Sequence, residues 1–511
     1  MLSVLIAVPL VGAFAVYFLP RELSKVLAIG FSLVTLVIAI VVAFRYKVDG
    51  GMQLTETHDW MKQFGVHYAL GVDGLGLLMV LLAAVLVPIV LIAEWPALDD
   101  PTGGGPKVYA AWALALEAFS LAVFCATDVF LFYVVFEATL IPAYFLVGSF
   151  GRPGRGRAAL KFLLFQLAGG LILLAAVVGL YVASARAGTP TYLISDLAKI
   201  HIDTVTERWL FVGFFTAFAI KAPLFPVHTW LADTTEKATP GTSVLLVCVL
   251  DKIGTFGMLR FCLGLFPDAS RWATPVVVAL ALISIVYGAL LAIGQDDMLR
   301  LIGLTSLSHF GLITLGIFAF SSQGGSGAIL YMINHGIGTA LLFLTAGYLH
   351  RRRGTLSIRE LSGQERLTPV LAGLFLVGGL ATLGLPGLST FVSEFLVLLS
   401  GFQYHWFVGA IAITAVVLAA IYVLWLYQRT FTGPASPVLE ADPVASRDLG
   451  VREIAAVVPL VVGLLLFGFV PQPLLNVANP MISDLMSHVG VRDPGPTVAG
   501  ATGSTNDGGG N

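Results

Sequence analysis

Six titratable side chains lie inside long apolar stretches of this sequence. They are Glu137, Lys221, Lys252, His309, His335 and Glu394. Only 11% of the 511 residues are charged, whereas soluble domains carry roughly a quarter. A charge at the centre of a bilayer costs about 2.5–3.5 kcal/mol on insertion scales, so each of these groups needs a reason to be there. Because carboxyl, ammonium and imidazole groups all exchange protons, the six residues, here called the polar axis, favour a proton path.

The acidic and lysine members of the polar axis each have a structural alternative. Glu137, in FLFYVVFEATLIPAYF, could stay protonated and bond to a hydroxyl or a backbone carbonyl, but a carboxylate paired with a lysine is favoured. Lys221 lies too far from either aqueous end of its apolar stretch to snorkel. For Lys252 the alternative is an ion pair with another helix, and for Glu394 it is a cap or ion pair near a helix break.

The two histidines lie in TSLSHFGLIT and YMINHGIGTA. A lone histidine in a helix bundle usually forms a hydrogen bond between helices. Two histidines among hydroxyl and amide side chains favour a proton relay, since histidine titrates near neutral pH.

Three further residues are weaker candidates for the same role. Glu117 could simply reach a partner on another helix, and His228 could line a half-helix or only pack. Asp251 directly precedes Lys252. Adjacent residues of a helix point about 100° apart, so we do not expect these two to pair with each other.

The elements that carry these residues are apolar blocks of about 18 residues or more, long enough to cross a bilayer as helices. We therefore predict an all-α membrane protein without a soluble catalytic domain. The fourteen predicted transmembrane helices are residues 2–19, 26–44, 75–93, 108–126, 129–150, 162–183, 209–231, 243–262, 275–293, 298–320, 327–349, 370–399, 406–427 and 454–471.

Two of these helices contain a proline beside a member of the polar axis. Pro223 follows Lys221, and Pro386 precedes Glu394. Proline removes one backbone donor and frees a carbonyl about four residues earlier, so both helices are expected to be discontinuous. Freed backbone groups in a buried break can hold water and ions.

An internal repeat relates the two halves of the chain. ALKFLLFQLAGGLILL, from Ala159, aligns with AILYMINHGIGTALLF, from Ala328, and Pro223 falls near Pro386 at a similar offset. We predict two inverted five-helix repeats, each with a discontinuous helix, a pattern typical of ion transporters. The predicted parts are helices 1–3 (1–107), the first repeat (108–264), the second repeat (273–428), a loop with helix 14 (429–475), and a disordered tail (487–511).

Most lysines and arginines fall in alternate connections, such as 152–161 and 351–353. By the positive-inside rule these basic loops face the cytoplasm, and an even number of helices then places both termini outside. Asp233 and Glu236 would lie at a cytoplasmic helix end and be solvated. The net charge of −2 gives no indication of a nucleic-acid partner, and the three cysteines form no metal-ligand pattern.

Six segments of the sequence resemble one family, the antiporter-like subunits of respiratory complex I, which are related to subunits of multi-subunit Na+/H+ antiporters. The segments are FYVVFEATLIP, IKAPLFPVHTWLAD, DKIGTFGMLRF, TSLSHFG, INHGIGTALLF and LPGLSTFVSEF. Of the family's L, M and N types, the M type is the most similar. It has a glutamate where L and N usually carry lysine, here Glu394, and it lacks the long lateral helix of L.

The resemblance implies a role for each member of the polar axis. Glu137 and Lys221 would form the key pair, Lys252 and the two histidines would continue the path, and Glu394 would be the terminal proton site. Asp251 matches no feature of the family pattern.

The resemblance also implies a non-redox subunit of an H+-translocating NADH:quinone oxidoreductase in the bacterial cell membrane. FMN, iron–sulfur clusters and quinone are expected in other subunits, with no metal or cofactor in this chain. Expected partners are L-type and N-type subunits, the lateral helix of L, and lipids. The alternatives are a subunit of a multi-subunit Na+/H+ antiporter and a structural scaffold, for which six buried ionisable groups would be costly.

Overall fold

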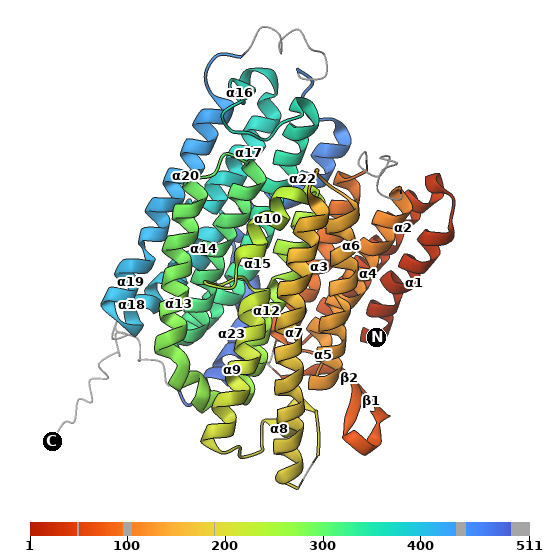
Figure 1. Cartoon of the computed structure of the whole chain (residues 1–511), viewed down its shortest axis with the longest axis vertical. Coiled ribbons are helices and arrows are strands. Elements are labelled where there is room, and N and C mark those ends of the chain that lie inside the picture. Colours follow the sequence, from red (N-terminus) through yellow and green to blue (C-terminus); the bar gives the residue numbers. More distant parts are fainter. Residues whose placement is uncertain (49–50, 96–104, 189, 436–445, 492–511) are drawn as a thin grey trace, which may run out of the picture.

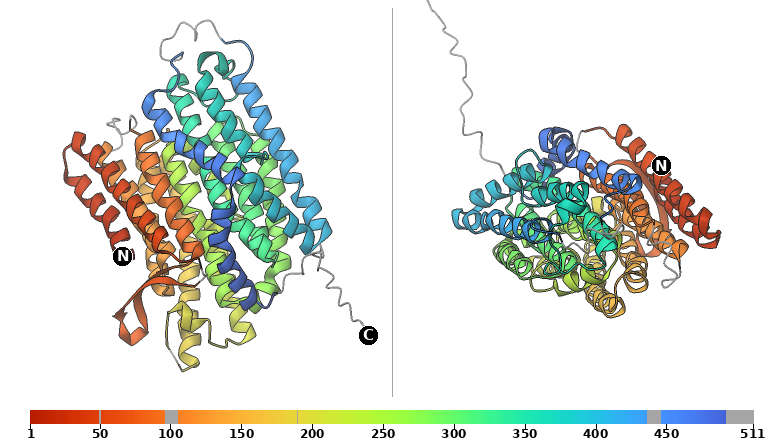
Figure 2. Two further views of the ribbon diagram at one scale, coloured as in Figure 1. Left: turned by 180° about the vertical axis from the view of Figure 1, so that it is seen from behind. Right: turned by 90° about the horizontal axis from the view of Figure 1, so that it is seen from above.

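The computed structural model describes residues 1–48, 51–95, 105–188, 190–435 and 446–491. Long helices packed side by side form a bundle, with α1 and α2 at one edge and α19 and α20 at the opposite edge (Figures 1 and 2). The predicted tail from residue 492 onward, and residues 436–445 of the predicted loop, lie outside the described residues.

The N-terminal part contains four long helices and a β-hairpin. Its elements are α1 (Leu2–Phe18), α2 (Arg21–Arg45), β1 (Gln53–Met61), the turn η1 (Lys62–Phe64), β2 (Val66–Val72), α3 (Gly74–Ala93) and α4 (Pro106–Cys125). The next part consists of α5 (Val129–Ala138), α6 (Leu140–Ser149), α7 (Arg155–Arg186), α8 (Ile194–Leu197), α9 (Thr204–Lys221), α10 (Thr229–Lys237), α11 (Pro240–Val244), the π-helical η4 (Leu245–Leu250), α12 (Lys252–Gly257) and the π-helical η5 (Met258–Leu263).

The C-terminal part is helical in all its named elements. They are α13 (Pro267–Ile293), α14 (Met298–Phe318), α15 (Ser322–Arg353), α16 (Gln364–Leu367), α17 (Pro369–Thr382), α18 (Ser389–Tyr404), α19 (Trp406–Ala412), α20 (Thr414–Phe431), α22 (Val451–Phe469) and α23 (Gln472–His488).

Eleven helices in the described residues are long and apolar enough to cross a membrane. The other three predicted spans fall on the shorter α1 and on the interrupted pairs α9/α10 and α17/α18. The apolar windows of α14, of α15 and of residues 240–263 are wholly buried inside the bundle, whereas those of α2 and α22 are mostly exposed. The innermost helices therefore carry the central titratable groups.

The two proline-containing helices are discontinuous, as the sequence predicts. Between α9 and α10 the chain leaves the helix for residues 222–228, and the indole of Trp230 donates to the freed carbonyl of Ile220 at 3.1 Å. Between α17 and α18 the break contains two glycines with positive φ, Gly384 (76°) and Gly387 (93°). Side chains and glycines thus satisfy or relax the backbone at each break.

The predicted helix 243–262 is not a regular α-helix. Two π-helical segments flank α12, so the backbone carries a wider turn on either side of Asp251 and Lys252. Such turns re-aim side chains and are frequent at functional sites.

The β1–β2 hairpin and α23 lie outside the fourteen predicted helices. The strands pair antiparallel from Gln53↔Val72 to Met61↔Val66, and Gly65 closes the turn with φ 62°. Helices α22 and α23 both lie beside α3 and α15 (Figure 2). Alternation in QLTETHDWM and the amphipathic pattern of 472–488 were the available signals.

Candidate functional site

Lys221 is fully buried at the C-terminal end of α9, where the helix breaks. Its Nζ donates to the hydroxyl of Thr139, between α5 and α6, at 3.3 Å and lies 4.8 Å from the ring centre of Phe136. The direct partner of Lys221 is therefore a hydroxyl two residues from Glu137. The ammonium and the Glu137 carboxylate still interact electrostatically.

A glycine on α7 makes room for the Glu137 carboxyl group. A Cβ placed at Gly170 would lie 1.8 Å from Glu137 Oε1, so no other residue fits there without moving the carboxyl group. No hydrogen-bond donor of the described residues contacts Oε1. The space over Gly170 thus fixes where Glu137 can lie.

Asp251 lies at the junction of η4 and α12, directly before Lys252, and is 1% exposed. A Cβ on Gly254, one turn further, would lie 2.4 Å from the backbone nitrogen of Ala222, so α12 packs directly on the break after α9. Spacing along the chain does not reveal that α12 packs on the break after α9, so Asp251 was only a weaker candidate from the sequence.

Lys252 of α12 contacts His335 of α15. Its Nζ lies 2.7 Å from Nδ1 of His335 and 4.3 Å from the ring centre of Phe310. The His335 ring is in turn 5.1 Å from the ring of His309, at 75° between planes. The order in space is therefore Lys252, His335, His309, which differs from their order along the chain.

Tyr422 on α20 extends the line of polar groups beyond the histidines. Its hydroxyl lies 3.4 Å from Nε2 of His309. It is 2% exposed. A phenol inside an apolar helix carries no charge at neutral pH, so the sequence did not indicate Tyr422.

Glu394 lies on the first turns of α18, and its carboxyl group reaches back over the break. A Cβ on Gly384 would lie 2.1 Å from Glu394 Oε2, which again shows a glycine making room for a carboxyl group. Beside it, a narrow void of about 180 Å³ is lined by His309, Tyr331, His335, Gly338, Thr339, Thr382 and Thr390. As the side chains stand, this void is too tight for a water molecule.

The structure shows the surroundings of the two other weaker candidates. Glu117 is buried on α4, and neither of its oxygens contacts a hydrogen-bond donor of the described residues. His228 packs against the rings of Phe225 and Tyr287, with ring centres 6.1 and 5.5 Å away.

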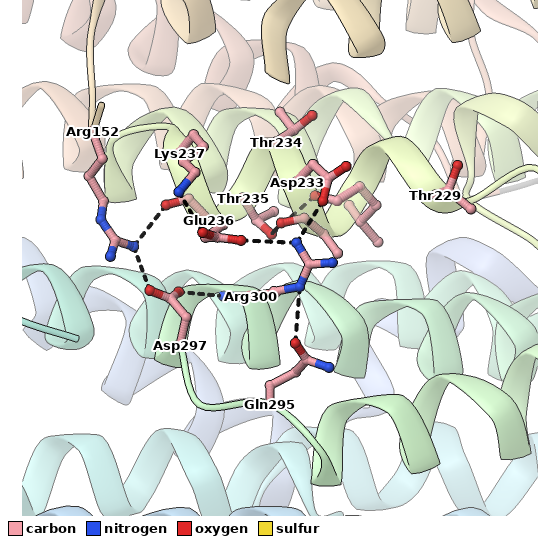
Figure 3. A network of polar contacts seen from close by, with 12 residues as sticks. Arg152, Thr229, Asp233, Thr234, Thr235, Glu236, Lys237, Gln295, Asp297 and Arg300 are labelled. Atoms are coloured by element: carbon pink, nitrogen blue, oxygen red, sulfur yellow. Dashed lines mark hydrogen bonds and ion pairs between the residues drawn. The ribbon is translucent and has the colours of Figure 1, made fainter. Parts of the chain in front are cut away.

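Asp233 and Glu236 were predicted to be simply solvated, but both form ion pairs. They join Arg300 of α14, which lies 2.6 Å from Asp233 and 2.9 Å from Glu236 (Figure 3). Arg152, Lys237 and Asp297 complete this ion network, which ties α10 to α14 and to the loop before α7. The expectation was wrong because it considered one helix end alone.

The ion network also affects protonation. Burial alone would raise the pKa of Asp233, but hydrogen bonds and ion pairs with Lys161 and Arg300 hold it below its ordinary value. In the same way, Lys237 and Arg300 outweigh burial and lower the pKa of Glu236. Both carboxyl groups are therefore ionised at neutral pH.

Comparison with known proteins identifies the class to which this arrangement belongs. A family model described as NADH:quinone oxidoreductase/Mrp antiporter, TM, matches residues 126–419. A protein named NADH-quinone oxidoreductase subunit M from Mycobacterium tuberculosis is 47% identical, over 98% of this chain and 96% of its own length. One of the same name from Rhodobacter capsulatus is 36% identical, over 91% of each chain.

Solved structures agree with this assignment. A chain of respiratory complex I from Thermus thermophilus with bound NADH superposes with a TM-score of 0.88 at 32% identity, over 96% of this chain and all of that one. A chain of the Mrp complex from a Dietzia species gives 0.83 at 21% identity, over 96% and 98%, which is a likeness of fold alone. The chain belongs to the family of membrane subunits shared by NADH:quinone oxidoreductases and Mrp antiporters.

Proposed function

We propose that this chain is the M-type membrane subunit of an NADH:quinone oxidoreductase and that it translocates protons. Identity of 47% over nearly the whole chain to a relative named subunit M supports this type. The observation that carries the mechanism is a line of titratable groups, all of them buried except the half-buried Glu137. It runs Glu137, Lys221, Asp251, Lys252, His335, His309, Tyr422 and Glu394.

Protons would move along this line by exchange between neighbouring groups. Lys252 and His335 are within hydrogen-bond distance, so a proton can pass directly between them. The rings of His335 and His309 are 5.1 Å apart, so rotation of either ring can bring their nitrogens together for proton exchange. The tight void beside Glu394 would have to widen for water to enter, which makes that part of the path a natural control point.

The surroundings of Lys221 suggest how energy is coupled to this path. With Thr139 as its hydrogen-bond partner, Lys221 interacts with carboxylates on two sides, Glu137 and Asp251. A shift of Glu137 toward or away from Lys221 would alter how strongly that ammonium holds its proton. The buried lysine would then release or take up a proton from the Asp251 side.

The architecture we propose for this function has fourteen transmembrane helices with two inverted five-helix repeats. The discontinuous pairs α9/α10 and α17/α18, with Pro223 and Pro386 in their breaks, support the repeat. The basic loops around 152–161 and 351–353 would face the cytoplasm and both termini the outside.

The redox chemistry would belong to other subunits, which would carry FMN, iron–sulfur clusters and quinone. L-type and N-type subunits, the lateral helix of L and lipids are the proposed neighbours. The similarity to a chain of respiratory complex I supports a place within such an assembly.

The test is substitution within an assembled complex. We expect Lys221→Ala and Glu137→Gln each to lower the number of protons pumped per NADH oxidised, measured in membrane vesicles while assembly is verified by native gel electrophoresis. A normal pumping ratio in an assembled variant would remove that residue from the path.

A subunit of an Mrp-type Na+/H+ antiporter is the second candidate, favoured by the family model and by the shared fold. Sodium transport without NADH, measured in the same vesicles, would support this candidate and overturn the first.

A further inference from the structure

Four arginines line one pocket at the end of the bundle where α15 ends and α22 begins. The pocket encloses about 270 Å³ and is lined by Arg351, Arg352, Arg447, Gly450, Arg452 and Glu453. We call it the arginine pocket. It lies away from the polar axis and has no part in the proton path described above.

Two of the arginines are held in place by carboxylates. Arg352 pairs with Glu453 at 2.6 Å and donates to the backbone carbonyls of Arg447 and Asp448 at 2.7 and 3.0 Å. Arg351 pairs with Glu94 at 2.8 Å and donates to the carbonyl of Ala93. These contacts build a fixed wall for the pocket.

The other two arginines bring charge that the described residues do not neutralise. Arg447 and Arg452 are exposed, and no carboxylate in the described part of the chain pairs with either of them. With Glu453 and Glu94 bound to their own arginines, the pocket keeps an excess of about two positive charges. This excess of positive charge is carried by guanidinium groups, whose forked donors suit a phosphate group.

The helix below the pocket indicates where that phosphate comes from. Arg452 begins a face of α22 that continues through exposed apolar side chains, Val462 (54% exposed) and Leu466 (51%). Val451, at the same end, is 87% exposed. A positive head above an uncovered apolar helix face matches a phospholipid, whose phosphate lies above its acyl chains.

We propose that the arginine pocket binds the phosphate of an anionic phospholipid whose acyl chains lie along α22. The site is independent of the proton path, so its failure would leave the proposed function intact. A soluble phosphate ion shares the headgroup chemistry and is the source that the experiment must exclude.

The test uses the purified complex in nanodiscs that contain photoactivatable phosphatidylglycerol. We expect cross-links on the peptides around 350–353 and 446–453. In the double variant Arg447→Gln/Arg452→Gln, labelling should fall by about tenfold or more, as expected for removing two surface cations. Arg359→Gln/Arg366→Gln removes the same charge from the same end outside the pocket and should label normally.

Competition then distinguishes the two sources. Unlabelled phosphatidylglycerol should displace the label, whereas phosphatidylcholine and inorganic phosphate should not. Undiminished labelling in the pocket variant, or displacement by inorganic phosphate alone, would overturn the proposal. NADH oxidation by the variant should stay normal, which separates loss of lipid from loss of assembly.

Discussion

Single side chains decide whether buried charge is tolerated here. Two carboxyl groups lie where a glycine leaves space, Glu137 over Gly170 of α7 and Glu394 over Gly384 in the second helix break. Lysines find a hydroxyl or an imidazole, since an ammonium without an acceptor would be costly in the bundle interior. Each buried charge therefore depends on one small or polar neighbour from another helix.

Gly170→Ala should impair proton pumping with little loss of stability. The new methyl group would meet the mobile end of Glu137 rather than backbone, so the carboxyl group moves and the helices stay. We expect fewer protons per NADH, measured by pH change in inverted vesicles. Gly156→Ala, on the same helix with open space around it, is the control. Equal pumping in both variants would contradict the role given to the position of Glu137.

Asp251→Asn should slow proton transfer between the two lysines. The amide keeps the shape of this buried side chain beside Lys252 but cannot take up or release a proton. A barrier increase of about 1.4 kcal/mol would slow the step about tenfold. The measurement is NADH-driven pumping by the assembled complex. A normal pumping ratio in the assembled Asp251→Asn variant would exclude Asp251 from the path.

Interrupted helices bring the axis together at the level of elements. The break after α9 leaves room for α12, whose Gly254 contacts the backbone of Phe218 and Ala222. The π-helical turns on either side of α12 orient Asp251 and Lys252 at this contact. Helix breaks and wide turns are therefore the means by which α9, α12 and α15 meet at their polar groups.

Gly254→Ala should destabilise this contact. Its Cβ would lie 2.4 Å from the nitrogen of Ala222 and 2.6 Å from the carbonyl oxygen of Phe218, and neither backbone atom can rotate away. Overpacking of this kind costs about 1–3 kcal/mol. We expect a lower thermal midpoint for the purified complex. Gly373→Ala, in α17 with nothing near its Cβ, should leave the midpoint unchanged or raise it.

The whole molecule is joined across its halves by the ion network of Figure 3. Arg300 begins α14 and reaches Asp233 and Glu236 on α10, while Arg152 reaches Asp297 at the start of the same helix. The second half of the first broken helix is thereby fixed to a central helix that carries His309. A movement of α10 would therefore be transmitted to α14, and a movement of α14 to α10.

The network should stabilise the protein at neutral pH and fail only in acid. Since the pKa values of Asp233 and Glu236 are lowered in the folded chain, their stabilisation is complete above the ordinary values of 3.8 and 4.5. It is lost as the pH falls through the lowered values. Asp233→Asn should therefore lower the thermal midpoint equally from pH 8 to about 5, with the difference from wild type shrinking below about pH 4.

The exposed Asp484→Asn is the control for this effect and should not change the midpoint at any pH. A deficit of Asp233→Asn that vanished already at pH 6 would contradict the lowered pKa.

The sequence by itself determined that this protein lies in a bilayer and which titratable groups it carries there. Long apolar blocks require helices in a bilayer, because only helices satisfy the backbone there. Titratable residues inside those blocks identified the polar axis, and Pro223 and Pro386 located both helix breaks, because proline acts locally on the backbone. These features follow from short-range physics, so they can be read along the chain.

Only the tertiary structure decided which of these groups meet. The hydrogen-bond partner of Lys221 is Thr139, Lys252 meets His335, and Tyr422 reaches His309. Each contact joins residues from different helices, and its existence depends on helix rotation, on π-helical turns and on space left by glycines. The sequence shows such groups one helix at a time, whereas proton transfer and ion pairing depend on distances of a few ångströms between helices.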